Sequence, residues 1–379
     1  MKDFKIASLP RLILKEGAFR DLPGLVAEAG FRDIGILHGR SVYASHGEGF
    51  RSSLRSFGIS FREAEVRTEP SPALVDSIVS AWSDRAPELI VAVGGGSVLD
   101  AGKAACAMLA EGGGVSAREY LEGVGSREPS GRTLPLYAVP STAGTGSEAT
   151  TNAVLSELGS FKKSLRHENF VPALACIDPL LAAGAPAQVS AAAGLDAITQ
   201  LLEAYLSTGA NEFTDALALS GLWAASGAFP RILREPGDLE ARLAMGYAAY
   251  LSGVVLANAG LGVVHGAASP LGAARTIPHG VVCGLLLPGS MRLIEKRAKS
   301  GGESILREKI EQAREALGAG ERDISELLEE LLAMSRLPGF ASYGFEADEL
   351  RLLSAATGLK NSPVSFSEEE IAGLFLERL

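Results

Sequence analysis

The sequence predicts an α/β domain built on a parallel sheet, followed by an all-helical domain. Three observations support this fold class. Short apolar runs alternate with segments of helical apolar spacing through the first half of the chain, two of these runs lead into glycine-, serine- or threonine-rich turns, and the strand-like runs stop after Pro179. Alternating strands and helices are typical of a parallel sheet covered by helices.

Four apolar segments are expected to form buried strands of this sheet. They lie at residues 34–37, 88–96, 133–142 and 173–179. Between them, residues 73–85 and 97–111 repeat apolar side chains at helical spacing. Strands that alternate with helices in this way are expected to lie parallel to one another.

The second half of the chain is expected to be helical throughout. Residues 187–258 are rich in Ala, Leu and Glu with helical periodicity, and further helical segments follow at 280–298, 303–316 and 322–335. The change of pattern falls near residues 179–186, where small residues and a proline occur. The predicted domains are therefore 1–182, which would bind a nucleotide, and 183–379, which would bind a metal.

Length and composition narrow the class of protein. A chain of 379 residues favours two domains. Its net charge of -10 argues against nucleic acid as a partner, because duplex binding needs a cationic face. The three cysteines are far apart and fit a reduced compartment, and no signal peptide or membrane-length apolar run is present in the sequence. We therefore expect a cytoplasmic enzyme without a membrane partner.

The segment VAVGGGSVLDAGKAA at 91–105 is the first sequence feature that points to chemistry. Glycines at a strand end allow the backbone to approach a pyrophosphate closely. A helix that starts at Ser97 would direct its unpaired amides and positive dipole end at that group. The alternative is a tight strand-to-helix turn without a ligand, but the strongly apolar strand before it favours nucleotide binding.

The segment PSTAGTGSEATTN at 140–152 also follows a predicted strand. It offers the hydroxyl groups of Ser141, Thr142 and Thr145 beside small residues. These groups could form a cradle for a phosphate and the nicotinamide ribose, or the segment could be an ordinary polar connection. Two such loops in one α/β domain favour the first interpretation.

An acidic residue and two histidines suggest a metal site in the second half. Asp196 and position 200 are four residues apart in a helical segment and therefore share one face. His265 and His279 are two of only five histidines and flank the Gly/Pro-rich connection GAASPLGAARTIP. A lone histidine in an apolar helix is usually a core residue, but two histidines together with an aspartate on a neighbouring helix favour metal ligation.

With these features the sequence resembles the iron-containing (group III) alcohol dehydrogenase family over essentially its whole length. The motifs that carry the resemblance are GGGSVLDAGKAA (94–105), PSTAGTGSEAT (140–150), GLDAITQLLEAY (194–205), GLGVVHGAASPLGA (260–273) and IPHG (277–280). The resemblance implies an N-terminal Rossmann-like domain and an all-α C-terminal domain, as in the dehydroquinate synthase-like fold, with the active site between them.

The resemblance also implies a set of coenzyme contacts. They fall on Gly95, Gly96, Ser97, Asp100, Ser141, Thr142, Thr145, Asn152 and Lys162. Lys162 lies in a segment, 156–170, that is interpreted as a loop. Without the family, this lysine would be regarded as a solvated surface charge.

The family binds its metal through an aspartate and three histidines, and three of these four match here. Asp196, His265 and His279 correspond, whereas Gln200 stands where the family has histidine. A neutral carboxamide oxygen is a weaker ligand than imidazole for Fe²⁺ or Zn²⁺, so Gln200 is expected to be a weak fourth ligand or a water-bridged neighbour of one such ion. Ser269 also replaces a frequent histidine near the nicotinamide, which leaves a hydroxyl, ribose or water to relay protons.

The implied activity is hydride transfer between C4 of NAD(P)(H) and a small alcohol or aldehyde whose oxygen the metal polarises. One alternative is a dehydroquinate synthase or a polyol or polyol-phosphate dehydrogenase of the same fold, which would need a denser cluster of basic residues. Another is a catalytically impaired coenzyme-binding homologue, with Gln200 and Ser269 as signs of decay. The presence of Asp196, His265 and His279 disfavours the second alternative.

Three finer expectations follow. Gly39 stands where NAD-preferring relatives have an aspartate, and Arg40 follows it, so NADP(H) is favoured over NAD(H) unless Arg40 simply points to solvent. Arg275 and Lys360 predict an anionic group on the substrate, unless they form salt bridges with acidic residues. The resemblance implies at least a homodimer, and residues 4–17 contain two apolar runs suited to an edge ribbon.

Overall fold

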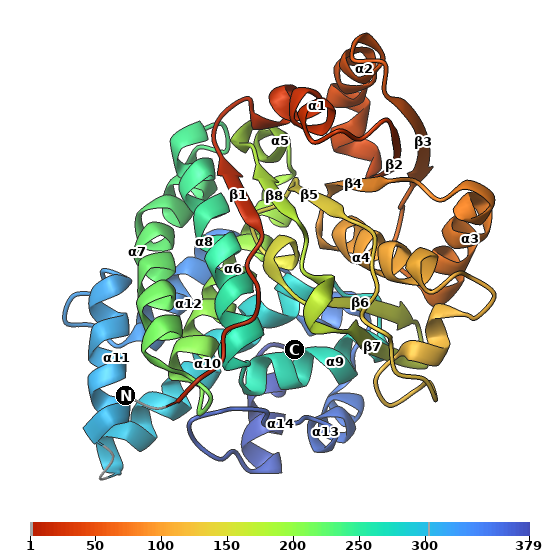
Figure 1. The fold of residues 1–379 in the computed structure, drawn as a ribbon. Helices are drawn as coiled ribbons and strands as arrows, with labels where there is room; N and C mark the ends of the chain where they lie inside the picture. Colours follow the sequence, from red (N-terminus) through yellow and green to blue (C-terminus); the bar gives the residue numbers. More distant parts are fainter. Residues whose placement is uncertain (1–2, 302–303) are drawn as a thin grey trace.

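The computed structural model describes residues 3–301 and 304–379, and it contains a parallel sheet followed by a helical half (Figure 1). The sheet has six strands in the order β1-β8-β5-β4-β2-β3, all paired in parallel. Its strands are β1 (Arg11–Leu14), β2 (Asp33–His38), β3 (Ser60–Glu65), β4 (Leu89–Gly94), β5 (Leu136–Pro140) and β8 (Leu174–Ile177). The predicted fold class is confirmed.

Helices cover both faces of the sheet, which explains why its central strands are continuous apolar runs. On β4, Leu89, Val91 and Val93 belong to a core shared with α1 (Ala18–Glu28) and α2 (Arg40–Ser56). The alternate residues Ile90 and Ala92 belong to the core under α3 (Pro72–Trp82) and α4 (Gly96–Ala110).

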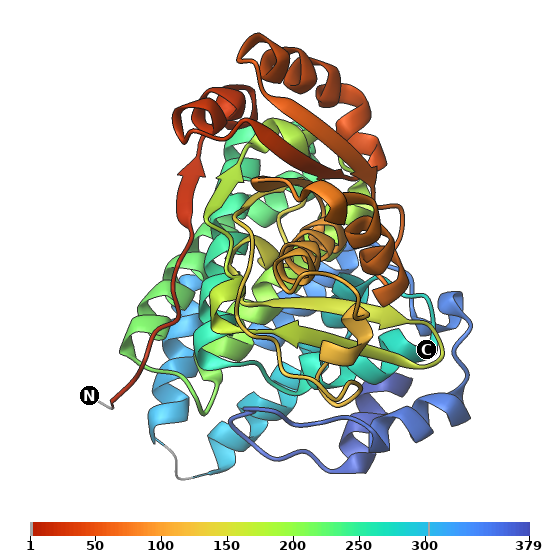
Figure 2. The same ribbon diagram turned by 45° about the vertical axis from the view of Figure 1, so that its right-hand side comes forward.

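Two strand elements were not recognisable in the sequence. β3 reads SFREAE and lies at the sheet edge, where its polar side chains meet solvent. The segment 156–170, interpreted above as a loop, is mostly an antiparallel hairpin of β6 (Asn152–Glu157) and β7 (Phe161–Arg166). The loop interpretation is wrong. The strands were hard to recognise because only Ala153, Leu155, Phe161 and Leu165 of the hairpin are both apolar and buried. The hairpin, yellow-green in Figure 2, packs on α4 and α9.

The helical half follows β8 directly. Its helices are α5 (Pro179–Ala183), α6 (Ala187–Leu206), α7 (Glu212–Arg234), α8 (Leu239–Ala259), α9 (Val263–Ala274), α10 (His279–Ser300), α11 (Ser304–Ala316), α12 (Ile324–Ser335), α13 (Ala347–Ala355) and α14 (Glu368–Leu376). Residue 303, where one helix was expected to begin, lies outside the described residues. The division into domains at 182 and 183 stays a prediction.

One expected connection is in fact a helix. The Gly/Pro-rich segment between the two histidines forms most of α9, with Pro270 inside it, and only residues 275–278 are irregular. A proline inside a helix has no N–H to donate to the carbonyl four residues earlier, and its ring crowds that carbonyl. Here the carbonyl belongs to Gly266, which has no side chain to add to the crowding.

α6 lies at the centre of the helical half. Its residues from Gly194 to Leu206 are all buried, because α7, α8 and α10 pack around it. Among the described residues, α7 is long and apolar enough to count as a candidate membrane span by length and composition, and α8 with α9 passes the same test as a pair bent by 99°. α7 buries one side in the helical core, through Ala218, Leu222 and Phe229.

Candidate metal and coenzyme site

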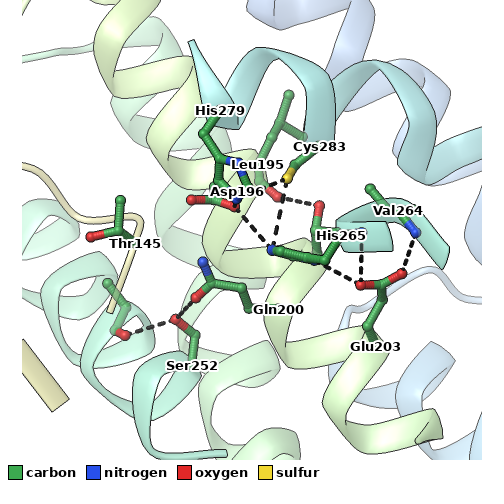
Figure 3. A network of polar contacts seen from close by, with 12 residues as sticks. Thr145, Leu195, Asp196, Gln200, Glu203, Ser252, Val264, His265, His279 and Cys283 are labelled. Carbon is green, nitrogen blue, oxygen red and sulfur yellow. Dashed lines mark hydrogen bonds and ion pairs between the residues drawn. The ribbon is translucent and has the colours of Figure 1, made fainter. Parts of the chain in front are cut away.

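Four side chains from three helices converge inside the helical half (Figure 3). They are Asp196 on α6, His265 on α9, and His279 and Cys283 on α10, and one ligand atom from each lies within 4.8 Å of all the others. Asp196 Oδ1 is 3.5 Å from His265 Nε2 and 3.7 Å from His279 Nε2. Cys283 Sγ is 3.8 Å from His265 Nε2 and 3.7 Å from His279 Nε2. Asp196, His265 and His279 are among the ligands predicted from the sequence, and Cys283 is not.

The start of α10 places two of the four groups. Pro278 precedes the helix and His279 is its first residue, so Cys283 lies one turn later on the same face. Gly280 allows α10 to approach α6 closely, because a Cβ there would lie 2.3 Å from the Ala192 carbonyl oxygen and 3.3 Å from Asp196 Cβ. The spacing HGVVC is therefore the signal that could have located the cysteine.

Three residues of the cluster are buried and His279 is half-buried, and one oxygen of the cluster has no hydrogen-bond partner among the described residues. Asp196 is 1% exposed, and its Oδ1 accepts no hydrogen bond among the described residues. Burial raises the pKa of Asp196, but the adjacent His279 and His265 together lower it by more, so the net pKa is below its ordinary value. An ionised carboxylate oxygen without a hydrogen bond in such a place is costly unless a cation lies beside it.

The remaining groups of the cluster have shifted pKa values as well. Burial lowers the pKa of His279 to about 4, which favours the neutral imidazole that ligates metals, although the side chain as a whole is 31% exposed. Burial also lowers the pKa of His265, but Cys283, Asp196 and Glu203 raise it more, and the net pKa is well above its usual value. Burial raises the pKa of the Cys283 thiol to about 12.

Glu203 contacts His265 on the side away from the cluster and is not among the residues predicted from the sequence. Its Oε2 is 2.7 Å from His265 Nδ1, and its Oε1 accepts a 2.7 Å hydrogen bond from the Val264 backbone amide. Burial raises the pKa of Glu203, but His265 and the backbone amides lower it below its usual value. Such a carboxylate fixes the ring orientation, so that Nε2 faces the cluster. Its position seven residues after Asp196, two helical turns on, was the available signal.

Gln200 is buried next to the cluster and is bound to Ser252. Ser252 Oγ lies 2.6 Å from Gln200 Oε1 and 2.8 Å from the Ala249 carbonyl oxygen. Ser269, the other departure from the family pattern, is exposed on α9. Its one-turn offset from His265 therefore does not bring it into the buried cluster.

The glycine loop lies at the carboxyl edge of the parallel strands. β4 ends at Gly94, and α4 begins at Gly96 with Gly95 as its N-cap, so no capping side chain covers the first amides of the helix. Gly95, Gly96 and Ser97 are half-buried. A Cβ at Gly96 would lie 2.7 Å from Thr145 Cγ2, so only glycine lets the second loop come this close.

The second loop follows β5 along the same edge. The Ser141 amide donates to the Gly94 carbonyl at 2.9 Å, which ties the two loops together. Ser141 is buried, whereas Thr142 and Thr145 are half-buried. The end of β2 is adjacent, since the Gly39 amide donates to the Val93 carbonyl at 3.0 Å. The structure thus brings the predicted coenzyme residues of three strand ends to one edge.

A buried polar network lies under the two loops. Lys103 Nζ donates to the Ser147 carbonyl at 3.0 Å and to Thr150 Oγ1 at 2.7 Å, and it pairs with Asp100 Oδ1 at 3.2 Å. Asp100 also accepts hydrogen bonds from Ser147 Oγ and from the Val154 amide. The structure therefore places Asp100 as a link between the two loops and the hairpin.

Two further predicted coenzyme residues lie on the hairpin. Asn152 Nδ2 donates to Ser164 Oγ at 3.2 Å. Lys162 Nζ binds both carboxylate oxygens of Glu69, at 2.7 and 2.9 Å. A Cβ at Gly272 on α9 would lie 3.8 Å from Lys162 Nζ, so this lysine spans the junction between the hairpin and the helical half.

The sheet edge that carries the loops after β4 and β5 is called the coenzyme edge below, and the group Asp196, His265, His279 and Cys283 is called the metal cluster. These two regions adjoin each other. A Cβ at Gly144 would lie 2.7 Å from Ala193, and one at Gly146 would lie 2.5 Å from Gly253. The second loop therefore rests directly on α6 and α8. Figure 3 shows Thr145 of this loop beside the cluster.

The two basic residues predicted to bind an anionic substrate differ in their surroundings. Arg275 Nη2 pairs with Glu349 at 3.0 Å, and Arg275 also contacts the Gly344 and Ala274 carbonyls. Lys360 is an exposed residue, but many protein atoms surround its ammonium group, and this partial burial lowers its pKa. The nearby Glu203 and Cys283 raise the pKa and partly offset the effect of burial. Lys360 therefore lies near the cluster, and Arg275 is held in an ion pair.

Comparisons with known proteins agree with this architecture. Residues 10–179 match the family model described as iron-containing alcohol dehydrogenase, and residues 190–379 match its C-terminal counterpart. The chain is 33% identical over 323 residues to Alcohol dehydrogenase 4 of Saccharomyces cerevisiae, covering 81% of each. It is 34% identical over 313 residues to the probable alcohol dehydrogenase EutG of Escherichia coli, covering 81% of this chain and 77% of that one.

A solved structure extends the agreement to three dimensions. The iron-containing alcohol dehydrogenase of Thermococcus thioreducens superposes with a TM-score of 0.85 at 26% identity and covers 99% of both chains. The chain belongs to the iron-containing alcohol dehydrogenase family. It is therefore an oxidoreductase of the alcohol dehydrogenase and aldehyde reductase type, and its family implies a metal and a nicotinamide coenzyme.

Proposed function

We propose that this protein is a metal-dependent, NAD(P)-linked dehydrogenase that interconverts a small alcohol and its aldehyde. The observation that carries the proposal is the unpartnered Oδ1 of Asp196, buried among imidazole and thiol groups and adjacent to the coenzyme loops. Imidazole, carboxylate and thiolate ligands together suit Zn²⁺ or Fe²⁺. The residues present therefore fit the metal that the family implies.

In this proposal Asp196, His265 and His279 hold the ion, and Glu203 keeps His265 in the correct tautomer and orientation. A bound divalent cation supplies Lewis acidity toward the substrate oxygen. The first amides of α4 and the hydroxyls of Thr142 and Thr145 bind and orient the coenzyme. The two parts adjoin, so the protein can present the nicotinamide C4 to the substrate carbon with water excluded.

The test is removal and return of the metal. Protein stripped with a chelator should lose NAD(P)-linked turnover of short alcohols and aldehydes and should regain it with Fe²⁺ or Zn²⁺. Binding of NAD(P)H, followed by its fluorescence, should be retained throughout. Full activity in the stripped protein would refute the metal role, and coenzyme binding without turnover on any substrate would favour an impaired homologue.

We also propose a preference for NADP(H) over NAD(H). Gly39 supplies no carboxylate next to the ribose position, and the exposed Arg40 at the start of α2 can pair with a 2′-phosphate. Arg40→Ala should lower kcat/KM for NADP(H) more than for NAD(H). A wild-type kcat/KM that clearly favours NAD(H) would contradict this preference.

We further propose that the substrate carries an anionic group. Lys360 supports this most directly, because no hydrogen bond or ion pair holds its ammonium group among the described residues and it lies near the metal cluster. Arg275 is the second candidate, although Glu349 already pairs with it. A neutral aldehyde and its ω-carboxylated analogue should be compared in wild type, Lys360→Met and Arg275→Ala. Equal kcat/KM for both substrates in wild type would contradict the proposal.

Finally, we propose a cytoplasmic protein that forms at least a homodimer. β1 lies at the sheet edge and pairs on one side with β8, which leaves its other side available for a second copy. Phe4 and Leu9, in the extended segment before β1, are exposed apolar residues. Light scattering at micromolar concentration tests this assembly, and a monomeric mass would contradict it.

A further inference from the structure

We propose that Cys283 is the fourth protein ligand of the metal, as a thiolate, in the role that the family gives to a histidine at position 200. The inference rests on the proposed metal-dependent function and assigns one of its ligands. Cys283 is fully buried on α10, one turn after His279. Its Sγ lies 3.8 Å from His265 Nε2 and 3.7 Å from His279 Nε2 (Figure 3).

Four of the six distances between the donor atoms are close to the edges of a tetrahedral site, and the other two are no longer than 4.8 Å. Bond lengths of about 2.0–2.1 Å to nitrogen or oxygen and about 2.3 Å to sulfur give tetrahedral edges of about 3.4 Å between light donors and about 3.6 Å to sulfur. The edges observed here are 3.5 and 3.7 Å from Asp196 Oδ1 to the histidines and 3.8 and 3.7 Å from Cys283 Sγ to the histidines. The four atoms are therefore close enough together for one ion to contact all of them after side-chain adjustment.

The buried aspartate gives independent support. Asp196 Oδ1 has no hydrogen-bond partner among the described residues and belongs to the same group of four atoms as Cys283 Sγ. A cation at their centre would satisfy the carboxylate and the thiolate together. The sulfur therefore lies in a place that needs positive charge and not in a purely apolar core.

Gln200 is the competing ligand, and its contacts direct it elsewhere. Its Oε1 is 2.6 Å from Ser252 Oγ. Figure 3 shows the amide nitrogen on the side of the cluster, and an NH₂ group has no lone pair to offer a cation. Ser252 Oγ is also 2.8 Å from the Ala249 carbonyl oxygen, and its single proton can be donated either to that oxygen or to Gln200 Oε1. Gln200 Oε1 is without this hydrogen bond when the proton goes to Ala249. A Gln200 variant must therefore be part of any test.

Ligation by Cys283 has a chemical consequence. When the ion binds, the S–H bond breaks, a metal–sulfur bond forms and the proton leaves to solvent. A soft thiolate favours Zn²⁺, Fe²⁺ and Co²⁺ over the hard ions Mg²⁺ and Mn²⁺. The site is therefore expected to be more selective for thiophilic metals than a set of carboxylate, imidazole and carboxamide alone.

The decisive measurement is the absorption spectrum of chelator-stripped protein loaded with Co²⁺. A thiolate ligand gives a sulfur-to-cobalt charge-transfer band in the near ultraviolet, which oxygen and nitrogen ligands do not give. The chain has three cysteines, so a Cys106→Ala/Cys176→Ala double variant leaves Cys283 as the sole thiol. The band should be present in wild type and in this double variant and absent from Cys283→Ser.

Metal affinity gives a second readout. Competition with a chromophoric chelator should show that Cys283→Ser binds Zn²⁺ at least about 10–100-fold more weakly, the range known for outer-shell partners. Gln200→Leu should retain the cobalt band and lose much less affinity. Circular dichroism and NAD(P)H binding establish that each variant is folded, and the double variant decides the question if Cys283→Ser does not fold.

Two results would overturn the inference. Co²⁺-loaded wild type could restore turnover without a charge-transfer band, in which case the metal function stands and the cysteine is not a ligand. Alternatively, Gln200→Leu could lose metal while Cys283→Ser keeps it. Failure of the proposed function itself would look different, because stripped protein would then remain fully active whatever its cobalt spectrum.

Discussion

The coenzyme edge and the metal cluster both bury charged groups, but they satisfy them in different ways. Under the coenzyme loops, the Lys103 ammonium has three partners, namely Asp100, the Ser147 carbonyl and Thr150. In the metal cluster, Asp196 Oδ1 has no hydrogen-bond partner among the described residues. The first network is complete within the protein, whereas in the second Asp196 Oδ1 lies 3.5 and 3.7 Å from two imidazole nitrogens without a hydrogen bond to either.

This difference separates structural burial of charge from functional burial. A buried charge with its own partners can hold loops in place, and its removal should lower the free energy of unfolding. A buried charge without a partner is costly and is tolerated where a ligand completes it. Variants of the first kind should therefore change folding, and variants of the second kind should change metal binding and turnover.

The largest effect is expected from breaking the metal cluster alone. His279→Ala removes one imidazole and should lower kcat/KM by about 10³-fold or more, because the Lewis acidity of a bound ion contributes several kcal/mol. NAD(P)H affinity, measured by fluorescence titration, should change little, since the glycine loop is untouched. His46→Ala on α2 is the matched control and should retain activity. A His279→Ala enzyme within tenfold of wild type would contradict the separation.

The converse variant should break the coenzyme edge alone. In Gly96→Ala the new Cβ would lie 2.7 Å from Thr145 Cγ2, so the two loops must separate. Overpacking costs about 1–3 kcal/mol. If this cost destabilises the coenzyme complex and not the free protein, coenzyme binding should be roughly 5–150-fold weaker.

Metal content of Gly96→Ala should stay at the wild-type level. Gly227→Ala on α7 is the control, because a Cβ there meets nothing within 4 Å. Loss of metal together with coenzyme in Gly96→Ala would show that the two regions are not separable.

Glu203→Gln should have a smaller and more specific effect. Glu203 orients His265, and outer-shell partners of this kind typically contribute 10–100-fold in metal affinity. Glu295 provides the control for Glu203. It is also buried, and its carboxylate oxygens accept hydrogen bonds from the Ile324 and Ser325 amides at the start of α12.

Both Gln variants should lower the melting temperature, because each weakens a charge-assisted cap of a helix. Only Glu203→Gln should weaken Zn²⁺ binding in a competition titration. Equal loss of metal affinity in Glu203→Gln and Glu295→Gln would mean that Glu203 acts through general stability and not through His265.

The sequence predicts the fold class and most of the candidate site, and the failures have identifiable causes. Strands that are buried on both faces, such as β4, are visible as continuous apolar runs, whereas β3 and the hairpin are half-exposed and have no such run. Asp196 and the two histidines stand in recognisable motifs. Cys283 and Glu203 lie at helical spacing from His279 and Asp196, but this spacing alone does not distinguish a ligand or its support from an ordinary core residue. The packing of α6, α9 and α10 against one another shows which groups they contact.

The smallest effect concerns Glu148, a buried carboxyl group near Lys103 under the coenzyme loops. Burial raises the pKa of Glu148 to about 7, although the nearby Lys103 lowers it. The folded state therefore holds this proton more tightly than the unfolded chain, so the associated stability is fully present below about pH 4.5 and is lost as pH rises through 7. Glu148→Gln mimics the protonated form and should not lose it, so the variant should gain about 1–3 kcal/mol on wild type between pH 5.5 and 8.5. Thermal unfolding at the two pH values measures this, with the exposed Glu128→Gln as control. Parallel pH profiles for wild type and Glu148→Gln would show that Lys103 already neutralises the carboxylate, and the coenzyme edge would then be complete at every pH.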